Sequence, residues 1–128
     1  MKPRLFLVWL VGLFLFLLPV PTDSHWYRHA HKFGAIAYSD STGDWGSSYN
    51  YDSREEAIEE ALRRCGRSDC VYKVWFRNSC GVIAKASNGA LGWSYGSKSL
   101  LEAKFWALEE CAKRGEGCKI LCWSCTDR

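Results

Sequence analysis

The chain contains an internal duplication in which both copies carry cysteines at matching places. The signature of residues 34–80 returns in residues 81–125. Each copy opens with a short apolar motif, GAIA at 34–37 and GVIA at 81–84, and then passes a turn with glycine and tryptophan. A segment with alanines four residues apart follows, and it leads into cysteines and a tryptophan in the same order. Repetition of this kind predicts two copies of one structural unit.

The N-terminus has the pattern of an export signal. Lys2 and Arg4 precede an unbroken apolar run, Leu5 to Leu18, which ends at a proline. This run is too short to span a bilayer comfortably. We therefore predict a signal peptide over residues 1–24 and one domain over residues 25–128, in a secreted or periplasmic protein. An uncleaved signal segment would be the expected membrane contact.

Each copy is predicted to fold as strand, strand, helix, strand. Ser53 with Glu56, and Ser99 with Glu102, form capping boxes at the starts of the two helices. The apolar stripe of each helix needs a partner surface. We therefore expect an α+β fold, with an antiparallel sheet, two helices on one face and a pseudo-twofold between the copies.

All seven cysteines lie beyond residue 64. In an exported domain of this size they favour disulfides over a reduced metal site. The layout predicts two equivalent bridges, Cys65–Cys70 and Cys111–Cys118. It also predicts a bridge between the copies, Cys80–Cys125, and leaves Cys122 as a free thiol. The residues alone leave a pairing of Cys80 with Cys122 open. Cys118, Cys122 and Cys125 also match the spacing of an iron–sulfur motif, but their exported context favours structural use.

The rest of the sequence offers little chemistry. The net charge of +3 is spread along the chain, without the Lys/Arg cluster typical of nucleic-acid binding. The acidic residues are explained by turns and helix starts, and no GxSxG or phosphate loop occurs. His25, His29 and His31 lie in an N-terminal arm. Cleavage before Asp23 would make His25 the third residue, where it could bind Cu(II) or Ni(II) together with the terminal amine and two amides, and cleavage before His25 would make it the terminus. A solvated arm is the simpler interpretation. We expect no cofactor, metal or nucleic acid.

Aromatic residues are the most suggestive feature. Phe105 and Trp106 stand where the first helix has two glutamates. They predict a surface that contacts another protein, unless this flank packs against Trp26 and Tyr27. Aromatic residues in the hairpins predict a second surface or a sugar-stacking platform, although core packing is their commoner role; they are Trp45, Tyr49, Tyr51, Trp93 and Tyr95.

The segment from Phe33 to Ala84 resembles a bacterial family of small exported proteins, domain of unknown function 4189. The resemblance rests on GAIAYS, on the Gly/Trp turn, on SREEA at 53–57 and on six of the seven cysteines. It implies a secreted or periplasmic single domain, in a family with mycobacterial members regarded as host-directed effectors, and a fold like that of a β-lactamase inhibitor protein. The family supplies no catalytic residues, and Cys122 departs from its six-cysteine pattern.

We therefore expect a non-catalytic, disulfide-stapled module that binds another protein, as an effector, inhibitor or immunity-type factor. Phe105, Trp106, Trp45 and Trp93 are its candidate contact residues. The alternative is a small exported hydrolase that acts on cell-wall polymers.

Overall fold

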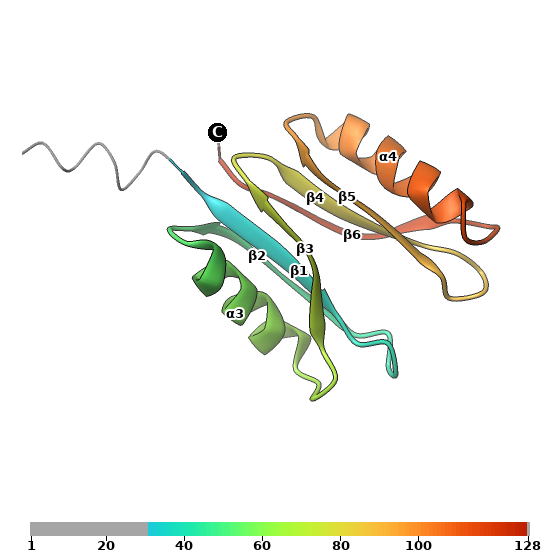
Figure 1. The fold of residues 1–128 in the computed structure, drawn as a ribbon, viewed down its shortest axis with the longest axis horizontal. Coiled ribbons are helices and arrows are strands. Elements are labelled where there is room, and N and C mark those ends of the chain that lie inside the picture. The colour runs from blue at the N-terminus through green and yellow to red at the C-terminus, as the bar shows by residue number, and fades with distance from the viewer. Residues whose placement is uncertain (1–30, 128) are drawn as a thin grey trace, which may run out of the picture.

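The computed structural model describes residues 31–127, and Figure 1 shows their arrangement. The predicted signal peptide, Trp26, Tyr27, His25 and His29 lie outside these residues. The elements, in chain order, are β1 (Phe33–Tyr38), β2 (Trp45–Tyr51), α3 (Arg54–Cys65), β3 (Val71–Arg77), β4 (Cys80–Lys85), β5 (Leu91–Ser97), α4 (Leu100–Ala112) and β6 (Lys119–Cys125). The α+β class and the duplicated strand, strand, helix, strand unit are confirmed.

The strands form two antiparallel sheets of three, in the orders β2-β1-β3 and β5-β4-β6. The two sheets pack face to face, with α3 on the outside of the first and α4 on the outside of the second (Figure 1). This differs from the single sheet with both helices on one face that we expected. The physical reason lies in the central strands. Ala35 and Ala37 of β1 pack against α3, while Ile36 between them packs against the other sheet. Both faces of the strand are therefore covered.

The core between the sheets is organised around Phe76. A Cβ atom added at Gly34 or at Gly81 would lie 2.4 Å from an atom of the Phe76 ring. These are the glycines that open the GAIA and GVIA motifs, so each copy contributes one glycine that makes room for this ring. Ile36 and Ile83 complete the contact from the two central strands.

Each helix sits on its sheet through a repeated set of small residues. In the second copy, Ala103, Ala107 and Cys111 of α4 are fully buried against the sheet. Ser94 Oγ of β5 donates a hydrogen bond of 2.5 Å to the Ala103 carbonyl, and Gly92 lets the helix backbone approach the strand. The first copy repeats these contacts with Ala57, Ala61 and Cys65, with the Ser48 hydroxyl bonded to the Ala57 carbonyl at 2.6 Å, and with Gly46.

Three disulfides join Cys65 to Cys70, Cys80 to Cys125 and Cys111 to Cys118, which is the pairing expected from the duplicated layout. Cys80 and Cys125 are partners on neighbouring strands β4 and β6. This bridge therefore holds the second sheet together and does not link the two sheets. Several disulfides in so small a domain are typical of a non-cytoplasmic protein. Within residues 31–127, no helix has the length and apolar character needed to cross a membrane.

Cys122 is a free thiol that lies in the core between the sheets, as expected for the odd cysteine. Burial raises its pKa to about 12, because a thiolate would lose its hydration there. Its counterpart in the first copy is Val74, which belongs to the same core cluster. The thiol therefore occupies the place of a small apolar side chain.

Candidate functional site

The outer face of α4 carries three large apolar side chains that the fold does not use. Leu101 is 80% exposed, Phe105 53% and Trp106 50%. We call these three residues the α4 patch. The rings of Phe105 and Trp106 meet edge to face, with centroids 5.2 Å apart and an interplanar angle of 73°. Their mutual contact limits the freedom of both rings, so the patch is partly ordered before anything binds to it.

The equivalent face of α3 is charged. Trp106 corresponds to Glu60, because the buried alanines Ala61 and Ala107 follow them at matching places. Glu60 forms ion pairs with Arg63 and Arg64, and hydrogen bonds from these arginines lower the pKa of its carboxyl to about 2. The same helix position thus supports the fold without any aromatic residue. The apolar character of the α4 patch is a feature of the second copy alone.

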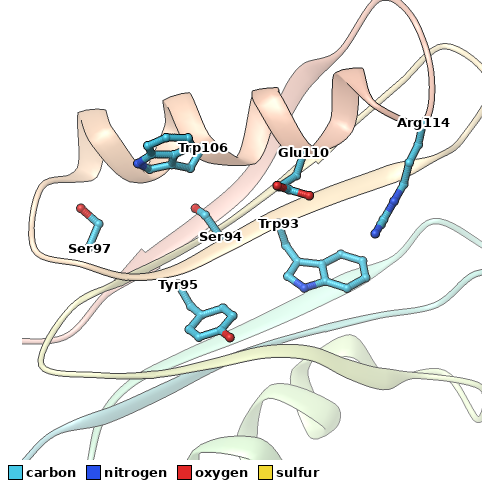
Figure 2. Close-up of a pocket in the computed structure, with 7 residues that line it drawn as sticks. All are labelled: Trp93, Ser94, Tyr95, Ser97, Trp106, Glu110 and Arg114. Atoms are coloured by element: carbon cyan, nitrogen blue, oxygen red, sulfur yellow. The ribbon is translucent and has the colours of Figure 1, made fainter.

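An open groove runs along the inner flank of the patch, between α4 and β5. It encloses about 410 Å³ and is lined by two tryptophans, a tyrosine, two serines, a glutamate and an arginine, namely Trp93, Trp106, Tyr95, Ser94, Ser97, Glu110 and Arg114. Figure 2 shows Trp106 and Glu110 extending from the helix, with Trp93 and Tyr95 on the other side of β5. The groove therefore combines aromatic rings with hydrogen-bonding groups at its rim.

The two charged side chains of the groove are positioned by contacts with neighbouring residues. The Arg114 guanidinium lies 5.2 Å from the centre of the Trp93 ring, and one of its nitrogens donates to the Leu91 carbonyl at 2.9 Å. Glu110 accepts a hydrogen bond of 2.8 Å from Lys113, and this contact lowers the pKa of the Glu110 carboxyl. Both side chains are thus engaged by neighbouring groups. Glu110 is ionised at neutral pH.

The structure brings three of the four predicted contact residues together. Trp106 and Trp93 line one groove, and Phe105 adjoins Trp106. Trp45 lies apart, at the start of β2 on the opposite sheet, and is 41% exposed. Among the described elements β2 makes no contact with α4. The sequence interpretation missed Leu101, although its position one helical turn before Phe105 could have indicated a shared face.

The described residues offer no arrangement typical of catalysis. Residues 31–127 contain no group of three or more His, Cys, Asp or Glu side chains that could hold a metal ion. Each of the four carboxyl groups with a shifted pKa, those of Asp44, Glu60, Asp69 and Glu110, is shifted downward by hydrogen-bond donors. A general acid needs the opposite shift. His31, the histidine that the structure describes, lies 3.2 Å from the Asn78 amide.

A hydrolase that acts on polysaccharides commonly uses two facing carboxyl groups. Glu110 is the one carboxylate among the residues that line the groove, and it is paired with Lys113. The geometry of the groove therefore does not favour the hydrolase alternative.

These features define a duplicated, disulfide-stapled α+β domain with an exposed aromatic helix. The chain belongs to the family described as domain of unknown function (DUF4189), whose profile matches residues 33–125. Protein Mb1300c of Mycobacterium bovis and Protein Rv1269c of Mycobacterium tuberculosis are each 41% identical to it over 66 residues. That match covers 49% of this chain and 52% of each relative, so the matched segment spans about half the length of these relatives.

A solved structure is also similar. The NMR structure of Rv1813c from Mycobacterium tuberculosis shares 29% sequence identity with this chain and superposes with a TM-score of 0.55. The similarity covers 84% of this chain and 80% of the other. The duplicated architecture of two helix-covered sheets is therefore similar to that of an experimentally determined fold.

Proposed function

We propose that this protein is a non-catalytic module that binds another protein through the α4 patch. The observation that carries the proposal is the exposure of Leu101, Phe105 and Trp106 on one helix whose sheet-facing side is already filled by small residues. Exposed aromatic clusters of this kind usually mark an interaction surface, and tryptophan is among the residues that contribute most to binding energy.

Comparison of the two helices, α3 and α4, supports the proposal. The sheet contacts of α3 and α4 are nearly the same, so the fold itself sets the same requirements at both helices. Positions 101, 105 and 106 correspond to Glu55, Glu59 and Glu60 in α3. Charged residues at these places are sufficient for folding. The apolar residues of α4 therefore need another explanation, and a bound partner supplies one.

The chemistry of the described residues supports binding over catalysis. The shifted carboxyl groups are held ionised by donors, and the free thiol is buried with its pKa raised. None of these groups is suited to give or accept a proton near neutral pH.

We further propose that the protein acts outside the cytoplasm after export, in the periplasm or as a secreted factor. The basic start and apolar run of residues 1–24 support export, and the disulfides require an oxidising compartment. An effector, an inhibitor and an immunity-type factor would each work in this way.

The test compares the wild-type domain with the double variant Leu101→Glu/Phe105→Glu. Both substitutions install the residue of the equivalent α3 position, so the fold should tolerate them. The matched control is Tyr49→Ala, which removes an exposed aromatic side chain on β2. Each immobilised domain is exposed to the secreted and periplasmic fractions of the source organism, and bound proteins are identified by mass spectrometry.

We expect one protein to be retained by the wild type and by Tyr49→Ala, and to be lost with the double variant. Retention of that protein by all three domains would contradict the proposal. Loss of binding to lipid vesicles by the double variant, with no protein retained by the wild type, would assign the patch to a membrane surface instead.

A further inference from the structure

We propose that the groove between α4 and β5 binds a neutral oligosaccharide built of pyranose rings. This inference goes beyond the protein-binding function of the α4 patch and does not depend on it. It rests on the shape of the groove, on its mixture of aromatic and hydrogen-bonding groups, and on its balanced charge (Figure 2).

The aromatic residues provide surfaces on which a sugar ring can stack. A pyranose presents several C–H bonds on one face, and these are attracted to the negative face of an aromatic ring. Trp106 and Tyr95 are well exposed, at 50% and 67%. Trp93 and Tyr95 are two residues apart and so extend from the same face of β5. A chain of sugar units could therefore contact more than one ring.

The polar residues suit the hydroxyl groups at the edge of a sugar ring. The ionised Glu110 carboxylate has two oxygens, of which Lys113 is bonded to one. Carboxylates accept strong hydrogen bonds from hydroxyl groups. Ser94 donates its hydroxyl proton to the Ala103 carbonyl, so its oxygen can accept from a ligand. Ser97 donates to the Ser99 carbonyl and accepts from the Ser99 N–H, which leaves its oxygen one further lone pair.

The charge of the groove favours a neutral ligand. The charged lining residues are one carboxylate and one guanidinium, those of Glu110 and Arg114, so their charges cancel. The Arg114 guanidinium also contacts the Leu91 carbonyl and the Trp93 ring. The lining therefore carries no excess of positive charge that would attract a phosphate or a carboxylate ligand. An apolar ligand fits poorly, because charged groups and open solvent border the site.

The first copy shows that the groove is an addition to the shared fold. Trp93 corresponds to Ser47, since Gly46 and Gly92 precede them at matching places. At the equivalent site Arg64 bonds both to Glu60 and to the Ser47 carbonyl, at 2.8 and 3.0 Å. That network occupies the place where the second copy has two tryptophans. The aromatic lining thus sits on a scaffold that folds without it.

The preorganised rings should make binding measurable but weak, because the groove is open. We expect a dissociation constant on the order of 0.1–1 mM for a tetrasaccharide. The probes are cellotetraose, maltotetraose and N-acetylchitotetraose, each added to the folded, disulfide-bonded domain. The readout is NMR, in which the indole N–H signals of Trp93 and Trp106 are followed during the titration.

We expect both indole signals to shift with at least one probe, with saturation. Trp93→Ser, which installs the first-copy residue, and Tyr95→Ala should each weaken binding by about fivefold or more. Tyr49→Ala replaces the equivalent exposed tyrosine of the first copy and should leave the affinity unchanged. Because Tyr95 is exposed, we expect Tyr95→Ala to fold like the wild type, so this variant keeps the test valid if Trp93→Ser is unfolded.

Two results would overturn the proposal. One is the absence of any indole shift with all three tetrasaccharides at about 10 mM. The other is an equal loss of affinity in Tyr49→Ala and Tyr95→Ala, which would indicate non-specific contact. If the same indole signals shift only when the protein partner of the α4 patch is added, the groove belongs to that protein interface and does not bind sugar.

Discussion

The close approach of α4 to β5 makes Gly92 a sensitive point of the fold. A Cβ atom added there would lie 2.1 Å from the Cys111 nitrogen and 2.6 Å from the Ala107 carbonyl oxygen. Ordinary contacts between heavy atoms are about 3.5 Å or longer. Because the obstructing atoms belong to the helix backbone, they cannot rotate away. In Gly92→Ala the helix must move outward by about 1 Å, and the hydrogen bond from Ser94 to the Ala103 carbonyl is strained with it.

Overpacking of this kind costs about 3 kcal/mol, near the upper end of its usual range. For a domain of this size that corresponds to a fall in Tm of roughly 12–24 °C. The sign of the stability change distinguishes a clash from its absence, because a glycine-to-alanine change without a clash commonly stabilises a protein by about 0.4–1 kcal/mol. Thermal unfolding followed by circular dichroism, without reductant, measures the effect.

Gly46→Ala should behave like Gly92→Ala, because its added Cβ would lie 2.2 Å from the Cys65 nitrogen. Lys98→Ala, at an exposed position before α4, is the control. A loss of less than about 1 kcal/mol in both glycine variants would refute the helix-on-strand contact that we describe.

Three further predictions concern stability. Replacing Cys80 and Cys125 by alanine opens a loop with a sequence separation of 45. This should lower the free energy of unfolding, measured by denaturant titration, by about 4 kcal/mol. A loss below about 1 kcal/mol would be inconsistent with this role of the disulfide. Cys122→Val installs the residue found at the equivalent position 74 of the first copy and should lower the free energy of unfolding by less than about 1.5 kcal/mol. The native thiol should resist iodoacetamide at pH 8, because burial raises its pKa to about 12. Rapid labelling of the folded protein would argue against that burial. The pKa of Asp69 is lowered to about 2 by hydrogen bonds from serines, so its contribution to stability is present above pH 4 and is lost as the pH falls from about 4 to 2; Tm measured against pH should decline less in Asp69→Asn, and identical profiles would contradict this role.

The repeated unit could be predicted from the sequence because each of its features has a local cause. Ser53 and Ser99 accept hydrogen bonds from the backbone of Glu56 and Glu102, as the capping boxes indicated. The cysteines follow the duplicated order of elements, so their pairing could be expected from that order. Both signals act within one copy, where chain connectivity restricts the alternatives.

The packing of the two copies could not be predicted in the same way. Whether two units share a sheet or stack depends on contacts between distant residues, and above all on the fit of Phe76 between Gly34 and Gly81. A glycine in a sequence does not reveal which ring will lie above it. The continuous apolar character of β1 and β4 was a usable sign that both faces of these strands are buried.

The candidate site was predictable in part. Comparison of the two helices identified Phe105 and Trp106, because the equivalent residues of α3 are acidic. It did not indicate that Trp93 would line a groove with Trp106, or that Arg114 would lie over the Trp93 ring. These contacts join a strand to the far end of a helix, and no sequence spacing reports them.

The most direct test of the binding function is site-specific photo-crosslinking on the α4 patch. Phe105 is replaced by the photoreactive p-benzoylphenylalanine, and the same group is placed at Tyr49 as a control. After irradiation in the source organism, the crosslinked products are separated and identified by mass spectrometry. Our account predicts one defined protein adduct at position 105 and none of that kind at position 49. No adduct at position 105, or the same mixture of proteins at both positions, would contradict it.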